Sequence, residues 1–235
     1  MAAALLVCLP LHYLWRLARR RSPWPRRFLA LVARAAGMRV RVVGVPLERD
    51  VLFLANHLSW LDILVLAGAS GTAFVAKAEV AETPLVGWLA GLNATVFVAR
   101  AERSAVRGQA DSLRSALGRG QPVALFPEGT TEGGGEILPF RASLLAALYP
   151  PLPGVMVQPV ALDYGAAARD LAWVGDETGL ANVRKVLSRR GSTPVIVQFL
   201  APVDPAAADR KSLASAARDE IVEALRPSGD GTDRL

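Results

Sequence analysis

Short runs of uncharged, mostly apolar residues recur along the chain, separated by polar, glycine-rich or proline-containing stretches. Runs this short, without a helical period, indicate strands buried on both faces, as in parallel sheets. They occupy residues 51–54, 73–76, 95–98, 123–126, 155–162 and 194–200. Residues 39–43 alternate instead, as Arg-Val-Arg-Val-Val, and therefore predict an edge strand.

Helical patterns fill the intervals between these runs. Helices are expected after the turn at residue 57 to about residue 69, from Pro84 to 92, and at 104–118, 138–149, 176–190 and 208–225. Strands that alternate with helices in this way predict an α/β fold with a mixed, largely parallel central sheet flanked by helices. Residues 39–226 are expected to form this main domain, and residues 227–235 a flexible tail.

The first 38 residues have a different pattern. Residues 2–15 are uncharged and are followed by Arg16, and residues 24–35 alternate apolar side chains with arginines. A helix of the first stretch would be about 21 Å long, short of the roughly 30 Å hydrocarbon core of a bilayer. We therefore expect residues 1–38 to form two membrane-associated helices in one leaflet, at the cytoplasmic face of the cytoplasmic membrane. A single tilted spanning anchor is the alternative.

Charge divides the chain in the same way. Residues 1–47 hold nine arginines and no acidic residue. The chain has 27 basic and 21 acidic residues, so residues 48–235 have 27 − 9 = 18 basic residues and all 21 acidic ones. The basic arm therefore suits anionic membrane lipids, and nucleic acid is disfavoured as a partner. Cys8 is the only cysteine, and His12 and His57 are the only histidines, which disfavours disulfides and a metal site.

Polar groups follow three of the predicted strands. They are Asn56, His57 and Asp62; Arg100 and Arg103; and Glu128, Gly129 and Thr130. Because parallel strands end at the same edge of a sheet, we expect the three groups to converge on one crevice.

His57 is the only histidine outside the apolar N-terminal segment, so it is the candidate for a general base that works near neutral pH. On one continuous helix, residues 57 and 62 would lie about 140° apart. They meet if His57 lies in the turn before the helix. With Ser59 as the N-cap, Asp62 would be the third helical residue and would reach back to one imidazole nitrogen, leaving the other for a hydroxyl proton. Alternatively, Asp62 only closes a capping box with Ser59.

The remaining polar groups are of the kinds that bind an anion. Arginine binds phosphate with a planar fork, which makes Arg100 a candidate, and Lys77 at the end of a neighbouring strand adds a charge. The turn at residues 129–130 would present backbone N–H groups to an oxyanion. Each has a second interpretation: Arg100 as a surface residue, Lys77 paired with Glu79, and Glu128 anchoring its own loop through backbone hydrogen bonds.

These residues resemble a known family, the glycerolipid acyltransferases typified by 1-acylglycerol-3-phosphate acyltransferase. Residues 56–62, N-H-L-S-W-L-D, are similar to its N-H-x4-D signature, and residues 126–130 match its F-P-E-G-T block. Residues 96–100 and 157–161 resemble its strand-plus-arginine block and its late proline-containing strand. The order and spacing fit from about residue 40 to residue 205.

The resemblance implies transfer of a fatty acyl group from acyl-CoA or acyl-carrier protein, a co-substrate rather than a cofactor, to the hydroxyl of a lysolipid. The acceptor that the resemblance leads us to expect first for this chain is 1-acyl-sn-glycerol-3-phosphate, which gives phosphatidic acid. His57 would be the base, Asp62 its orienting partner and Arg100 the phosphate binder, with residues 128–130 shaping the acceptor site. The wider expected substrate-binding set adds Asn56, Lys77 and Arg103. Attack would be direct, since the chain has no G-x-S-x-G motif.

One position departs from the family pattern. Members that act on lysophosphatidate commonly have Arg after E-G-T, whereas this chain has Thr131. The missing guanidinium weakens the case for a phosphomonoester acceptor unless Arg103 or Arg141 replaces it, and it leaves a lyso-ornithine lipid or another lysolipid open. A thioesterase or esterase that uses the same His/Asp pair on water would also fit these residues, and so would a non-catalytic membrane adaptor.

Overall fold

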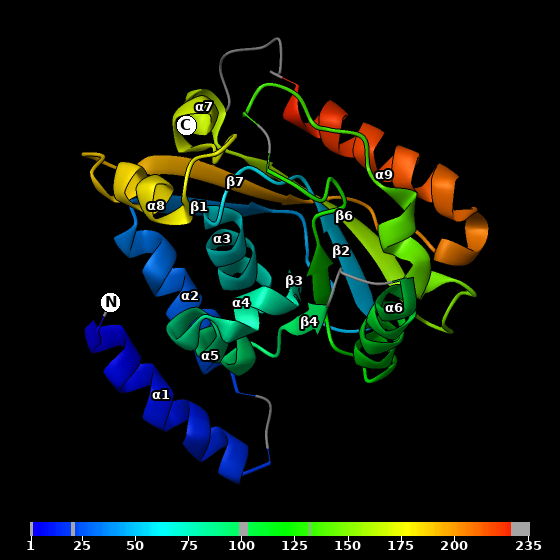
Figure 1. Ribbon diagram of the computed structural model, residues 1–235, viewed down its shortest axis with the longest axis horizontal. Coiled ribbons are helices and arrows are strands. Elements are labelled where there is room, and N and C mark those ends of the chain that lie inside the picture. Colours follow the sequence, from blue (N-terminus) through cyan, green and yellow to red (C-terminus); the bar gives the residue numbers. More distant parts are fainter. Residues whose placement is uncertain (1, 20–21, 99–102, 132, 227–235) are drawn as a thin grey trace.

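The computed structural model describes residues 2–19, 22–98, 103–131 and 133–226. Within them, one sheet has the strand order β1-β7-β6-β2-β5-β3-β4 (Figure 1). The strands are β1 (Met38–Val43), β2 (Val51–Ala55), β3 (Ala73–Lys77), β4 (Val96–Val98), β5 (Val123–Leu125), β6 (Met156–Asp163) and β7 (Thr193–Phe199). β6, β2, β5, β3 and β4 are parallel, β7 is antiparallel to β6, and β1 at the edge is parallel to β7. The predicted mixed, largely parallel sheet is confirmed.

Helices connect the strands as predicted, with some differences in detail. The α-helices are α1 (Ala2–Leu17), α2 (Trp24–Ala35), α3 (Leu61–Ser70), α4 (Ala78–Glu82), α5 (Pro84–Leu92), α6 (Arg103–Gly118), α7 (Ala168–Leu171), α8 (Gly179–Leu187) and α9 (Arg210–Leu225). The 3-10 helices are η1 (Ala142–Leu148), η2 (Gly165–Ala167) and η3 (Pro205–Ala207). The helix predicted at 138–149 is only the 3-10 helix η1. Pro139 cannot donate a backbone hydrogen bond, and the N–H of Leu138 is taken by Glu128, so a regular helix does not start there.

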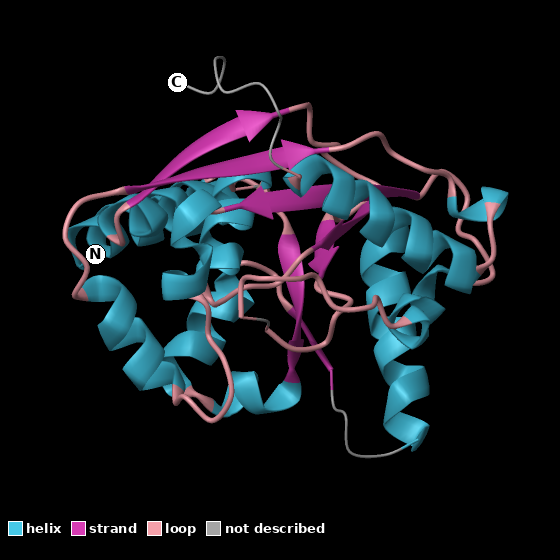
Figure 2. Ribbon diagram, turned by 90° about the horizontal axis from the view of Figure 1, so that it is seen from above, coloured by secondary structure: helices cyan, strands magenta, loops and turns pink. Residues whose placement is uncertain are grey.

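β2 lies inside the sheet, and all five of its residues are buried. Val51, Phe53 and Ala55 pack with α2, α3, α7 and α8 on one face, whereas Leu52 and Leu54 pack with α6, η1 and α9 on the other. Figure 1 shows these two groups of helices on opposite sides of the sheet, and Figure 2 shows that the uppermost strands are left uncovered by helices. Burial of each large apolar side chain contributes about 1.5–3 kcal/mol, so the carboxyl end of β2 is held firmly where the polar residues begin.

α2 packs into the main domain. Val32 is buried in the same cluster as the apolar residues of α3. The two helices approach closely at Gly68, where a Cβ atom would lie only 2.9 Å from the Cα atom of Ala30. Arg26 donates hydrogen bonds to the carbonyl oxygens of Gly68 (3.3 Å) and Ala69 (2.6 Å) at the carboxyl end of α3. The basic amphipathic helix predicted at 24–35 therefore places much of its apolar face on protein.

α1 lies beside α2 at the outer edge of the molecule (Figure 1). It leaves large apolar side chains uncovered. At least half of the surface is exposed for Leu6, Val7, Tyr13, Leu14 and Leu17. In the part of the chain that the structure describes, no helix is both long enough and apolar enough to cross a membrane.

Candidate active site

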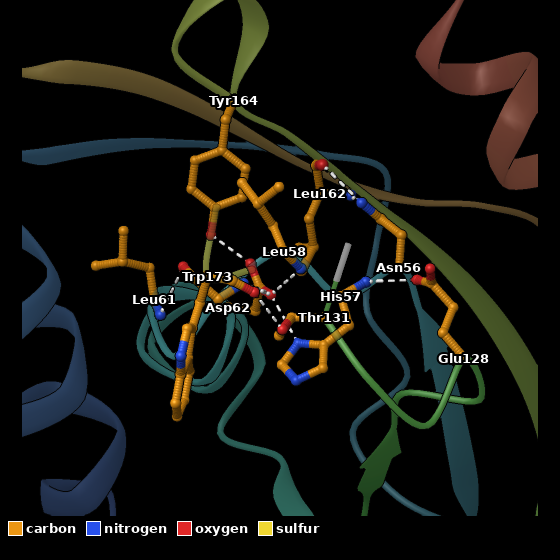
Figure 3. Close-up of polar contacts among 11 residues, drawn as sticks. Asn56, His57, Leu58, Leu61, Asp62, Glu128, Thr131, Leu162, Tyr164 and Trp173 are labelled. Carbon is orange, nitrogen blue, oxygen red and sulfur yellow. Dashed lines mark hydrogen bonds and ion pairs between the residues drawn. The ribbon is translucent and has the colours of Figure 1, made fainter. Parts of the chain in front are cut away.

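The carboxyl end of β2 leads into a tight turn around the carboxyl group of Asp62. His57 lies in this turn, with Nδ1 at 2.8 Å from Asp62 Oδ2. The same oxygen accepts hydrogen bonds from the backbone N–H groups of Leu58 (2.6 Å) and Ser59 (2.8 Å) (Figure 3). Asp62 is fully buried, so these donors replace the water that a carboxylate would otherwise bind. The structure thus joins His57 and Asp62, as their spacing predicts.

The local geometry of the turn differs from the predicted one. Ser59 is not the N-cap, because α3 begins at Leu61 with Trp60 in the capping position, and Asp62 is the second helical residue. The Ser59 hydroxyl accepts a hydrogen bond from the N–H of Leu61 at 3.3 Å. The N–H groups at residues 58 and 59 are bound by the Asp62 carboxylate, which closes the turn in place of a serine hydroxyl.

The His57 ring is fixed on its faces as well as at Nδ1. It stacks on Phe126, with ring centroids 4.0 Å apart and planes 9° apart, and Phe126 stacks in turn on Phe74. Because Asp62 is an acceptor, the hydrogen bond places the ring proton on Nδ1 and leaves the lone pair on Nε2. The His57 side chain remains 19% exposed, and among the described residues nothing is hydrogen-bonded to Nε2. This nitrogen is therefore available to a substrate hydroxyl.

Glu128 supports the backbone beneath the imidazole. Its Oε1 accepts the N–H of His57 at 2.7 Å, and its Oε2 accepts the N–H of Leu138 at 2.9 Å. Burial raises the pKa of Glu128 to about 7, and the hydrogen bonds from Leu138 and His57 oppose this rise. The geometry matches the interpretation in which Glu128 anchors its own loop. Its side chain also lines the cavity beside His57, so a substrate role stays a prediction.

Asn56 connects the ends of two neighbouring strands. Its Nδ2 donates to the carbonyl oxygen of Leu162 at 3.1 Å, and its Oδ1 accepts the N–H of Leu162 at 2.8 Å (Figure 3). This reciprocal pair fixes β2 against β6 at the level of His57. Since Asn56 also lines the cavity, its predicted substrate contact stays untested.

Arg141, which lies outside the E-G-T motif in the sequence, lies close to the E-G-T turn. Gly129 has a φ of +76°, and a Cβ atom there would lie 3.3 Å from the guanidinium carbon of Arg141. Because residue 129 is a glycine, Arg141 can lie close over the turn. Arg141 would need this position in order to replace the arginine that is missing after E-G-T. Thr130 is exposed, whereas the Thr131 hydroxyl donates to the carbonyl oxygen of Trp173 and ties the loop down.

For three predicted anion-binding residues, the structure does not describe the side chains. Lys77 is the last residue of β3 and Arg103 the first of α6, but their side chains lie outside the described structure, as does Arg100 as a whole. β3 and β4 run parallel to β2, so both strands end at the edge of the sheet that holds His57. Their roles stay predictions.

Tyr164 is a site residue that the sequence patterns did not reveal. It directly follows β6, and its hydroxyl donates to Asp62 Oδ1 at 2.7 Å (Figure 3). Burial and the Asp62 carboxylate raise the pKa of Tyr164 well above its usual value, so the phenol keeps its proton and acts as a donor. The only signal in the sequence was its position just after a buried strand. The pairing itself spans 102 residues, which no local motif encodes.

A cavity of about 410 Å³ opens beside the imidazole. The residues that line it include His57 and three acidic residues, Glu128, Glu136 and Asp163. No lysine or arginine belongs to the described residues that line it, and the glycines at 134, 135 and 165 leave room along the wall. The cavity is thus large enough for a small head group and is lined by potentially anionic groups.

A buried strand, a histidine–carboxylate pair and an adjoining cavity are the parts of a base-catalysed transfer site. The family model described as Acyltransferase matches residues 39–163, and this chain belongs to that family.

Relatives of two kinds match over most of the chain. The lyso-ornithine lipid O-acyltransferase of Brucella abortus is 36% identical over 94% of this chain and 89% of its own length. That of Rhodobacter capsulatus is 37% identical over 92% and 84%. The 1-acyl-sn-glycerol-3-phosphate acyltransferase of Neisseria gonorrhoeae is 30% identical over 84% and 76%. The chain is thus a lysolipid acyltransferase by family, with two acceptor types among its relatives.

A solved structure shares the fold. The crystal structure of the 1-acyl-sn-glycerophosphate acyltransferase from Thermotoga maritima superposes with a TM-score of 0.60 and 24% identity. The match covers 97% of this chain and 99% of that protein. At this identity the likeness confirms the fold alone.

Proposed function

We propose that this chain is a membrane-bound O-acyltransferase whose acceptor is a lyso-ornithine lipid. The observation that carries the choice of acceptor is the cavity beside His57, whose lining includes Glu136 and Asp163 and no lysine or arginine among the described residues. An ornithine head group has a side-chain ammonium, which carboxylates stabilise, whereas a phosphomonoester would meet like charge there. Thr131, in place of the arginine common in lysophosphatidate enzymes, and the 36–37% identity to lyso-ornithine lipid acyltransferases support the same acceptor.

The reaction follows from the free nitrogen of His57. Nε2 removes the proton of the acceptor hydroxyl as its oxygen attacks the thioester carbonyl of acyl-CoA or acyl-carrier protein. Asp62 keeps the imidazole oriented and stabilises the imidazolium that forms. When the C–S bond breaks, the imidazolium returns the proton to the departing thiolate. The products are the ester and the free thiol, and no acyl-enzyme is required.

Lysophosphatidate is the second candidate acceptor. Arg141 lies against Gly129 of the E-G-T turn, where it would supply the charge that Thr131 lacks. Lys77, Arg100 and Arg103 are the other predicted contacts for a phosphate or a carboxylate.

Membrane association would come from α1. Its exposed apolar side chains suit the acyl region of one leaflet. The adjoining arginines suit anionic head groups, and the Arg27 guanidinium lies 4.7 Å from the centre of the Trp24 ring. We propose the cytoplasmic face, on the basis of the positive flank.

An acyl-transfer assay tests the function. Detergent-purified protein would be given acyl-CoA or acyl-carrier protein with lyso-ornithine lipid, lysophosphatidate or another lysophospholipid, and ester and thiol would both be measured. We expect the highest kcat/KM with lyso-ornithine lipid and no transfer by His57→Ala, since the other imidazole, His12, is buried between α1 and α2. Thiol release without an acceptor would indicate a thioesterase. Transfer confined to lysophosphatidate would exclude the proposed acceptor.

A further inference from the structure

The two oxygens of the Asp62 carboxylate have different partners. Oδ2 accepts three hydrogen bonds, from the ring of His57 and from the N–H groups of Leu58 and Ser59. Oδ1 accepts the hydroxyl of Tyr164 at 2.7 Å, and no other described residue donates to it. The two oxygens thus bind different parts of the chain: the turn that holds His57, and the segment that follows β6.

Tyr164 is well placed to hold the carboxylate in one orientation. Its side chain is 3% exposed and packs in the apolar cluster with α3 and β6. Rotation of the Asp62 carboxyl group would break the Tyr164 bond and the three bonds on Oδ2 together. The tyrosine is therefore a fixed donor on the side of the carboxylate away from the imidazole (Figure 3).

We infer that Tyr164 is a positioning residue that sets how readily His57 accepts the proton of the acceptor hydroxyl. This inference rests on the proposed role of His57 as the base. A donor on Oδ1 draws negative charge toward that oxygen and so reduces the attraction of the carboxylate for an imidazolium at Oδ2. It also keeps the carboxylate in the plane in which Nδ1 donates. Tyr164 thereby acts on the base through Asp62, without touching the reacting atoms.

Loss of this hydroxyl should shift the pH dependence of the reaction in one definite direction. Without the donor, Asp62 attracts the imidazolium more strongly, so His57 holds a proton up to a higher pH. The acid limb of the kcat/KM profile then moves to higher pH. The looser carboxylate lowers kcat at the plateau by about tenfold, a loss typical of a hydrogen bond to a charged group, while KM is unchanged.

Tyr164→Phe tests this inference against a matched control. Tyr149→Phe removes a hydroxyl that donates to the carbonyl oxygens of Ala208 and Pro205, away from the site, and should leave the profile unchanged. In Tyr164→Phe we expect both the shift of the acid limb and the fall in kcat. An unchanged profile would overturn the inference, as would a rise in KM alone, which would make Tyr164 a substrate contact.

A second variant covers the case in which Tyr164→Phe folds poorly. Site-specific 3-fluorotyrosine at position 164 keeps the ring and the hydroxyl but donates more strongly, so the acid limb should move to lower pH. A shift in the same direction as for phenylalanine, or no shift, would contradict the inference.

Imidazole NMR separates this inference from the proposed function. The chain has two histidines, so His12→Gln leaves the signal of His57 alone. Its titration midpoint should rise in Tyr164→Phe whether or not the protein accepts any lysolipid. Absence of transfer by the wild type would refute the proposed function, and an unmoved midpoint would refute the role of Tyr164.

Discussion

The carboxyl group of Glu128 accepts the backbone N–H of His57 at 2.7 Å across 71 residues of sequence. Its other oxygen accepts the N–H of Leu138, so one side chain joins the turn after β2 to the segment before η1. Asp62 fixes the ring of His57, and Glu128 fixes its main chain. His57 is therefore held at two points by two buried carboxyl groups.

Stability should depend on pH through Glu128. Its pKa is raised from 4.5 to about 7, which means that the folded chain binds this proton more tightly than the unfolded chain. The contribution of Glu128 to the free energy of unfolding is therefore fully present below pH 4.5 and is lost as the pH rises through about 7. A shift of this size corresponds to roughly 3 kcal/mol.

Denaturant unfolding of Glu128→Gln at pH 5 and pH 8 would check this dependence. The variant should be less stable than the wild type at both values, because an amide nitrogen replaces one of the two acceptors. The difference in the free energy of unfolding between the variant and the wild type should be smaller at pH 8, where the wild type has lost the contribution of Glu128. Glu220→Gln, on the exposed surface of α9, should show no such change. If this difference is the same at both pH values, the pH dependence of stability does not come from Glu128.

The charge of the cavity should decide the acceptor. Glu136→Lys places an ammonium where the proposed ornithine head group needs a carboxylate, so KM for lyso-ornithine lipid should rise by about tenfold or more. For lysophosphatidate KM should fall, since attraction replaces repulsion. Steady-state kinetics with both acceptors would measure the change, with Glu220→Lys as the charge-matched control outside the cavity. Equal changes for both lipids would show that Glu136 does not discriminate between them.

Arg100 should matter most for a phosphate-bearing acceptor. Its planar fork would bind a phosphomonoester in bidentate fashion, so Arg100→Ala should raise KM for lysophosphatidate by about tenfold or more. The effect on a phosphate-free head group should be smaller. Arg119→Ala is a suitable control, because Arg119 is exposed and bonds to Ser115 within α6. An unchanged KM for lysophosphatidate would remove Arg100 from the acceptor site.

Much of the fold and half of the catalytic arrangement could be predicted from local pattern. The short apolar runs predicted the strands, and the spacing of His57 and Asp62 predicted their contact, since a turn before a helix is a short-range feature. The contact of Tyr164 with Asp62 and the hydrogen bond from His57 to Glu128 could not be predicted. Both join segments that only the strand order brings together, and sequence spacing carries no information about which buried strands become neighbours.

Binding to a lipid surface should depend on α1 more than on α2. The apolar face of α2 is packed against α3, so deletion of both helices would also remove part of the core. Leu14→Asp with Leu17→Asp changes only exposed positions of α1 and should reduce co-sedimentation with vesicles of anionic phospholipid. Leu180→Asp on α8, where the side chain is 80% exposed, is the control and should leave binding unchanged. If the α1 variant still binds vesicles as well as the wild type, this face of α1 is not the membrane contact.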